Sequence, residues 1–169
     1  GDYLSGKAVD GLNKMGGKIG DKVKEKLGKE ISEEVTEKVG KEVAEEVFES
    51  LENSASKHNV KLQISVDDII VTANRRQMTE LMFNLCDNAI KYNLPGGRVS
   101  LKVENHRLVV NDTGIGIPTE HKDRIFERFY RVDKARSRQS GGSGLGLAIV
   151  RAIVQRNRGE ITVATQVGQ

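Results

Sequence analysis

A short stretch at residues 84–92 constrains this chain more than any other, because it places three polar side chains on one face of an expected helix. It reads Asn-Leu-Cys-Asp-Asn-Ala-Ile-Lys-Tyr. Asn84, Asn88 and Lys91 are spaced four and three residues apart, so they are neighbours on an α-helix. Carboxamide oxygens suit Mg²⁺, and a lysine one turn away can contact a phosphate that the metal carries. Taken alone, such a triple also fits a solvated polar face.

The elements around this stretch predict a mixed α/β fold. The period-two alternation of 61–66 indicates a half-buried strand, and 69–72 is a second β-branched run. Asn74 is placed to cap the helix that carries the polar triple. The buried stripe of that helix is expected to be Met78, Leu81, Met82, Leu85, Ala89 and Ile90. Residues 98–103 and 107–110 are predicted to form a β-hairpin.

The hairpin leads into Asn-Asp-Thr-Gly-Ile-Gly-Ile-Pro at residues 111–118. Gly114 and Gly116 directly follow a strand and let the backbone approach a ligand closely. Asp112 stands at the strand end, where its carboxylate can accept a hydrogen bond from an exocyclic amine such as that of adenine. An isolated motif of this kind is more often an ordinary turn.

A second glycine-rich loop, residues 141–147, precedes an apolar segment that predicts a helix. Such a loop at a helix start is a site for phosphate. The loop lacks the Gly-Lys-Ser/Thr of a P-loop, and no strand immediately precedes it as in a dinucleotide-binding fingerprint.

A basic segment lies between the two glycine loops. Phe126 and Phe129, three residues apart, would anchor it to the domain, although the spacing is equally typical of a plain packing pair. Its cations could cover a polyphosphate or form a solvated surface, and they are Arg124, Arg128, Arg131, Lys134, Arg136 and Arg138.

Composition excludes several classes of protein. A net charge of +3 with 30% charged residues argues weakly against a dedicated nucleic-acid binder. The single cysteine, Cys86, excludes an intramolecular disulfide and is expected in the core. No apolar run is long enough to span a bilayer and no signal-peptide pattern opens the chain, so we expect a soluble polypeptide.

Residues 1–48 are predicted to be an amphipathic helical segment that precedes a domain at 49–169. A near repeat covers 28–39 and 40–51, with apolar residues at every fourth position. This spacing exceeds the helical repeat of about 3.6 residues, so the apolar stripe drifts around a single helix. One long helix, or two joined near Gly40, would serve as a dimerising element, or the segment is a linker or an appended piece of chain.

In their order and spacing, these motifs resemble the catalytic ATP-binding domain of sensor histidine kinases, within the superfamily of gyrase B, Hsp90 and MutL. The resemblance covers about residues 45–165 and includes an N box (84–92), a G1 box (112–118), an F box (125–130) and a G2 box (142–147). It implies the Bergerat ATP-binding fold, an α/β two-layer sandwich with a mixed sheet packed on about three helices.

The resemblance also implies residue roles, cofactors and partners. Asn88 would bind the Mg²⁺ of Mg·ATP, and catalysis would involve Asn84, Lys91 and Arg131. The nucleotide-binding set would be Asn84, Asn88, Lys91, Tyr92, Asp112, Gly114, Gly116, Tyr130, Arg131, Gly142, Gly144, Leu145 and Gly146. The partners would be a phosphoacceptor helical domain and a response regulator, with homodimerisation through the N-terminal helix and no nucleic acid. The chain would be a cytoplasmic domain of a usually membrane-anchored sensor.

Asn84 bears on the reaction. In the ATP-hydrolysing relatives, the residue one turn before the metal-binding asparagine is a glutamate that activates water as a general base. A carboxamide cannot accept that proton. The resemblance therefore points to phosphoryl transfer onto a protein histidine, with little hydrolysis.

Two features depart from the family pattern. None of His58, His106 and His121 lies in the expected acceptor motif H-[ED]-x-x-[NT], so transfer is expected only in trans. Members of the family continue past the position of Gly168 with a further strand. The domain is therefore expected to be C-terminally truncated, with a strand at 160–164 left as an open edge. The alternatives are a nucleotide-binding or interaction module without transfer, and a serine kinase of the anti-sigma-factor type.

Overall fold

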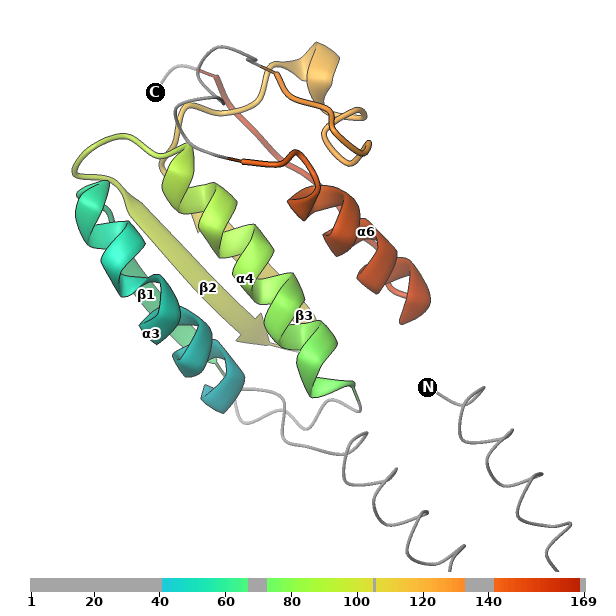
Figure 1. Cartoon of the computed structure of the whole chain (residues 1–169), viewed down its shortest axis with the longest axis horizontal. Coiled ribbons are helices and arrows are strands. Elements are labelled where there is room, and N and C mark those ends of the chain that lie inside the picture. Colours follow the sequence, from blue (N-terminus) through green and yellow to red (C-terminus); the bar gives the residue numbers. More distant parts are fainter. Residues whose placement is uncertain (1–40, 67–72, 105, 133–141, 168–169) are drawn as a thin grey trace, which may run out of the picture.

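The computed structural model describes residues 41–66, 73–104, 106–132 and 142–167 (Figure 1). Their regular elements are α3 (Lys41–Lys57), β1 (Lys61–Val66), α4 (Arg75–Lys91), β2 (Arg98–Glu104), β3 (Arg107–Asp112), the 3-10 turn η1 (Thr119–His121) and α6 (Gly146–Arg156). The expected helix over residues 1–40, the β-branched run at 69–72 and the cations Lys134, Arg136 and Arg138 lie outside the described residues.

The three described strands form a mixed sheet in the order β1-β2-β3. β1 runs parallel to β2 with Leu62 opposite Val99, and β2 runs antiparallel to β3 with Leu101 opposite Val110. A parallel neighbour requires a crossover connection, and α4 supplies it between β1 and β2. The predicted strand at 61–66 and the predicted hairpin are confirmed.

The helices form one layer on one face of this sheet. Figure 1 shows α3 and α4 side by side on the strands, with α6 on the other side of α4. The core between the layers includes the fully buried Leu51, Met82, Cys86, Ile90, Val99, Leu101 and Val150. The predicted two-layer α/β sandwich, with a mixed sheet on three helices, is confirmed. In the part of the chain that the structure describes, no helix is both long and apolar enough to cross a bilayer.

The helix α4 begins and ends where its sequence predicts. The Asn74 side chain accepts a hydrogen bond of 3.1 Å from the Gln77 backbone N–H, which satisfies one of the unpaired donors of the first turn. The helix ends at Tyr92, before Leu-Pro-Gly-Gly. At Gly97 a Cβ would lie 2.1 Å from Asn93 Oδ1, so this turn accepts only glycine.

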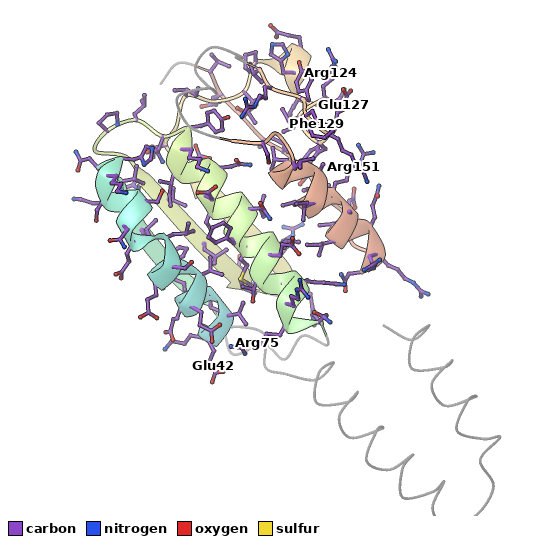
Figure 2. The ribbon with its side chains drawn as sticks, in the orientation of Figure 1. Glu42, Arg75, Arg124, Glu127, Phe129 and Arg151 are labelled. Carbon is purple, nitrogen blue, oxygen red and sulfur yellow. The ribbon has the colours of Figure 1, made fainter. Side chains whose placement is uncertain are left out.

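The expected boundary between residues 48 and 49 falls inside α3. The first two turns of this helix bury Val43, Ala44 and Val47 in the same core as α4 and the sheet. The Arg75 guanidinium, at the start of α4, pairs with Glu46 and lies 3.9 Å from Glu42 (Figure 2). From Lys41 onward, α3 is therefore packed as part of the α/β unit.

The strand expected at 160–164 is not formed. Residues 159–166 have no helix or strand assignment, and β3 has no ladder partner among them. A strand is defined by the hydrogen bonds of its ladder, which a sequence pattern cannot supply. This segment is held by side chains instead: Ile161 packs against the core, and Thr165 Oγ1 accepts a 2.7 Å hydrogen bond from the Ile117 N–H.

Burial determines the chemistry of Cys86. Removal from water, followed by the charge of Asp87, raises the pKa of the Cys86 thiol from 9.0 to about 12. The folded state favours the protonated thiol, whereas the unfolded chain ionises it above pH 9. The contribution of Cys86 to the free energy of unfolding is therefore fully present below pH 9 and is lost as the pH rises towards 12. Over this window we expect this residue to lower the free energy of unfolding by roughly 1 kcal/mol per pH unit.

Urea denaturation at several pH values, on the wild type and on Cys86→Ala, measures that loss. The difference between the two proteins isolates the thiol from the other groups that titrate at high pH. Two parallel stability profiles above pH 9 would contradict the assignment.

Candidate functional site

The polar face of α4 meets the glycine-rich loop at the start of α6. A Cβ at Gly146 would lie 2.9 Å from the side-chain oxygen of Asn84, so this oxygen occupies the space that any larger residue would fill. The other end of the same carboxamide donates a 2.8 Å hydrogen bond to the Glu80 carbonyl oxygen, which orients it. The structure therefore brings together two of the motifs that the sequence indicated.

Asn88 and Lys91 continue this face of α4 towards its C-terminus. Lys91 Nζ donates a 2.7 Å hydrogen bond to Asp87 Oδ2. Among the described residues, none is hydrogen-bonded to the Asn88 carboxamide. One carboxamide is thus available for a ligand, and an ammonium group lies one turn away.

The aspartate-glycine loop after β3 lies against the C-terminal end of α4. Ile115 N–H donates a 3.1 Å hydrogen bond to the Tyr92 carbonyl oxygen, and a Cβ at Gly114 would lie 2.5 Å from that oxygen. Asp112 Oδ1 accepts a 2.8 Å hydrogen bond from the Gly114 N–H. This bond orients the carboxylate, which remains exposed.

Gly116 adopts a left-handed conformation with φ of +73°. A Cβ there would lie only 2.1 Å from the Gln166 carbonyl oxygen. Both the conformation and the contact require glycine at this position.

The two sides of the basic segment are joined by a backbone hydrogen bond. Phe129 N–H donates to the Gly144 carbonyl oxygen at 2.9 Å. Gly144 has φ of +73°, and a Cβ there would lie 3.0 Å from Phe129 Cα. Arg131 lies along the same loop, because a Cβ at Gly142 would be 3.3 Å from its Nη2 atom. Before α6, Leu145 N–H donates to Ser143 Oγ at 3.3 Å.

The expectation that Phe129 anchors the basic segment is wrong. Its side chain is 71% exposed, whereas Phe126 is partly buried. The reason is the backbone: Phe129 has φ of +64°, so the residue does not continue a helical turn and the i, i+3 pairing is lost. Figure 2 shows Phe129 with Arg124 and Glu127, above the start of α6, on whose outer side Arg151 projects.

Sequence reasoning missed a cluster that holds Tyr130. The Tyr130 hydroxyl is hydrogen-bonded to His121 Nδ1 at 2.5 Å, and the Arg124 guanidinium lies 4.3 Å from the centre of the tyrosine ring. Arg124 is also paired with Glu127 at 3.3 Å, and this hydrogen bond raises the pKa of the guanidinium. The nine-residue separation of His121 and Tyr130 matches no regular period, so a sequence pattern cannot find it.

A polar network ties the end of α4 to the sheet. Thr113 Oγ1 donates to Asn93 Oδ1 at 3.1 Å and accepts from the Arg98 N–H at 2.9 Å. Asn93 Nδ2 in turn donates to the Arg98 carbonyl oxygen at 3.0 Å. The network positions Asp112 and Gly114, which flank Thr113.

Thr113→Val removes both hydrogen bonds of the hydroxyl while keeping the shape of the side chain. We expect the free energy of unfolding to fall by about 1 kcal/mol. Urea denaturation measures this fall, and Thr113→Ser, which keeps the hydroxyl, serves as the control. A serine variant that is destabilised as much as the valine variant would show that the methyl group matters instead.

The residues at this site fit Mg²⁺ bound together with a nucleotide better than a metal ion held by protein side chains alone. In the described ranges, no group of three or more His, Cys, Asp or Glu side chains could hold a metal ion. Mg²⁺ is commonly held by one or two protein oxygens and by the phosphates of its nucleotide. The carboxamide of Asn88 could supply such an oxygen, and the close approach of Asn84 to Gly146 places this face of α4 beside the N-terminus of α6, where a phosphate could bind.

A separate open depression of about 520 Å³ lies on the sheet. Gln63, Ser100 and Asn111 line it as a row across the three strands. None of the predicted site residues lines it.

Comparisons with known proteins bear directly on this arrangement. Residues 73–169 match the family described as histidine kinase-, DNA gyrase B- and HSP90-like ATPases. The chain belongs to this family. The matched region includes all four motifs that meet around α4 and α6, so the resemblance to the catalytic domains of sensor histidine kinases is confirmed.

The relatives of this ATPase-family chain are histidine kinases. Sensor histidine kinase RppB of Synechocystis sp. is 40% identical over 124 residues, which cover 70% of this chain and 27% of that protein. The catalytic domain of histidine kinase ThkA, in a nucleotide-free form, has 28% identity and a TM-score of 0.58, covering 68% of this chain and 76% of that one. Full-length ShkA in complex with AMPPNP has 25% identity and a TM-score of 0.62. The match covers 75% of this chain and 27% of the ShkA chain. The chain spans about a quarter of the length of the curated relatives it matches.

Proposed function

We propose that this chain binds Mg·ATP between α4 and the loop that opens α6, and that it transfers the γ-phosphoryl group to a histidine of a separate phosphoacceptor helix. The observation that carries the proposal is the close approach of the Asn84 side chain to Gly146. This approach brings the polar face of α4 beside the N-terminus of α6. The complex of the related ShkA with AMPPNP supports a nucleotide in such a domain.

Each part of the site has a proposed role. Asn88 would hold Mg²⁺, which would offset the charge of the phosphates, and Lys91 would contact a phosphate. Asp112 accepts a hydrogen bond from the adenine amine, beside a loop shaped by Gly114 and Gly116. The remaining residues proposed to contact nucleotide are Tyr92, Tyr130, Arg131, Gly142, Gly144, Leu145 and Gly146.

Asn84 favours transfer over hydrolysis. Its carboxamide donates a hydrogen bond to the Glu80 carbonyl oxygen and has no basic group with which to deprotonate water. In the proposed reaction a neutral imidazole nitrogen of the acceptor attacks the γ-phosphorus in line with the departing oxygen of ADP. The bond from nitrogen to phosphorus forms as the bond from phosphorus to the bridging oxygen breaks, and the imidazole proton passes to solvent.

The proposed partners follow from this reaction. The acceptor histidine belongs to a dimerising helical domain, and a response regulator receives the phosphoryl group from it. The names of the relatives, which are sensor histidine kinases, support these partners. A cytoplasmic site of action is part of the same proposal. Homodimerisation through the N-terminal helical segment, residues 1–48, is also proposed, and residues 1–40 of that segment lie outside the described ones.

A binding titration tests the nucleotide site. A fluorescent ATP analogue is titrated into the protein with Mg²⁺ present and is then displaced by ATP, ADP or GTP. We expect saturable binding, with displacement by ATP and ADP at far lower concentrations than by GTP. Absence of saturable binding would overturn the proposal.

A transfer assay tests the reaction. The chain is mixed with radiolabelled ATP and a separate protein that carries an acceptor helix with its histidine, beside the same protein with that histidine replaced by glutamine. We expect an acid-labile label on the first acceptor only. An acid-stable label would indicate a serine kinase, and no label despite nucleotide binding would indicate a binding module.

A further inference from the structure

The polar face of α4 carries one more charged group, Asp87, to which the proposed function gives no role. This residue lies three positions after Asn84, directly before Asn88 and four before Lys91, so all four share one side of the helix. Its carboxylate accepts the 2.7 Å hydrogen bond from Lys91 Nζ. A negative charge therefore stands inside the proposed phosphate site.

The ion pair of Asp87 and Lys91 is shielded from water. The two side chains are only 20% and 27% exposed. Charges in such a position interact more strongly than at the open surface, because water screens them less. The Asp87 charge already acts on its surroundings, since it contributes to the raised pKa of Cys86.

Fold maintenance does not account for this carboxylate. Asp87 lies far from the cap at Asn74 and one turn before the last residue of α4, where a negative charge gains nothing from the helix dipole. Within the ranges that the structure describes, Lys91 is its side-chain partner. An ion pair between two neighbouring side chains on one helix contributes little to the free energy of unfolding, about as much as other i, i+4 pairs.

We propose that Asp87 makes nucleotide binding depend on a divalent cation. Without the cation, the carboxylate occupies the Lys91 ammonium and repels the full negative charge of a metal-free nucleoside triphosphate. With the cation bound, the phosphates carry less net charge, so Lys91 can contact them while Asp87 faces the bound cation. Asp87 is thus a specificity-determining residue that selects the metal complex of the nucleotide. The inference rests on the proposed nucleotide site.

The test compares ATP affinity with Mg²⁺ and with EDTA, in the wild type and in Asp87→Asn. Asparagine keeps the shape of the side chain and an oxygen acceptor for Lys91 but removes the charge. We expect the wild type to bind ATP far more tightly with Mg²⁺. In Asp87→Asn the affinity for metal-free ATP should rise, so that the ratio of the two affinities falls about tenfold.

Two variants control for other effects. Asp87→Glu keeps the charge and should keep the wild-type ratio. Glu52→Gln, on the exposed side of α3, changes the net charge by the same amount and should also leave the ratio unchanged.

The outcomes separate this inference from the proposed function. A wild type that binds Mg·ATP, with an Asp87→Asn ratio equal to its own, would overturn the inference alone. So would an Asp87→Asn variant that loses affinity equally with and without Mg²⁺, since Asp87 would then only position Lys91. A wild type that binds no nucleotide would overturn the proposed function and the inference together.

Discussion

Gly146→Ala is expected to lower the affinity for Mg·ATP about tenfold without lowering the melting temperature. The new Cβ would lie 2.9 Å from Asn84 Oδ1, and a carboxamide at the end of a flexible side chain can rotate away. Folding therefore tolerates the change, and alanine is a better helix former than glycine by about 1 kcal/mol. Only the affinity for nucleotide is expected to fall, because the displaced Asn84 carboxamide no longer contacts the nucleotide. One well-placed polar contact is worth about a factor of ten in affinity.

Fluorescent nucleotide titration and thermal unfolding, measured on the same protein, check both halves of this expectation. Gly159→Ala is the matched control, because its Cβ would meet the side chain of Val154 at 3.2 Å, at the far end of α6. Unchanged affinity in Gly146→Ala would show that the contact between Asn84 and the glycine loop does not form the nucleotide site.

Asp112→Asn is expected to weaken ATP binding about thirtyfold and to remove the preference for adenine over guanine. The asparagine oxygen can still accept the hydrogen bond from the Gly114 N–H, which is 2.8 Å in the wild type. The conformation of the loop is therefore kept. The substitution removes only the charged carboxylate that would accept the hydrogen bond from the adenine amine. A hydrogen bond to a charged group contributes roughly 2 kcal/mol, which corresponds to this loss.

Competition of the bound fluorescent analogue by ATP and by GTP measures the preference directly. Asp123→Asn, an exposed aspartate in the turn after η1, is the matched control and should bind as the wild type does. If Asp112→Asn retained the wild-type ratio of ATP to GTP affinity, Asp112 would not contact the base.

The fold was predictable where local signals agree with one another. Asn74, the apolar stripe of α4 and the glycines after Tyr92 all define the same helix, and the structure has it there. The strand expected at 160–164 had an alternating pattern but no ladder to join, and pairing depends on residues distant in the sequence. The burial of Val43 and Val47 likewise depends on α4, so a change of composition near residue 48 could not place the edge of the packed unit.

The site was predictable as a set of motifs, and less so as a set of contacts. The sequence indicated Asn84 and Gly146 separately, and only the packing of α4 against α6 brings them to the same place. The exposed position of Phe129 depends on a left-handed backbone conformation, which is uncommon for a bulky residue and has no sequence signal. The pairing of His121 with Tyr130 arises within an irregular turn, where no periodicity applies.

The hydrogen bond from Phe129 to Gly144 has a consequence for how this part of the chain can vary. It fixes the two ends of the connection between the F box and α6 relative to each other, as the base of a closed loop. A substitution that moves the Gly144 backbone would therefore displace Phe129 as well, so the glycine loop and the F box cannot vary independently.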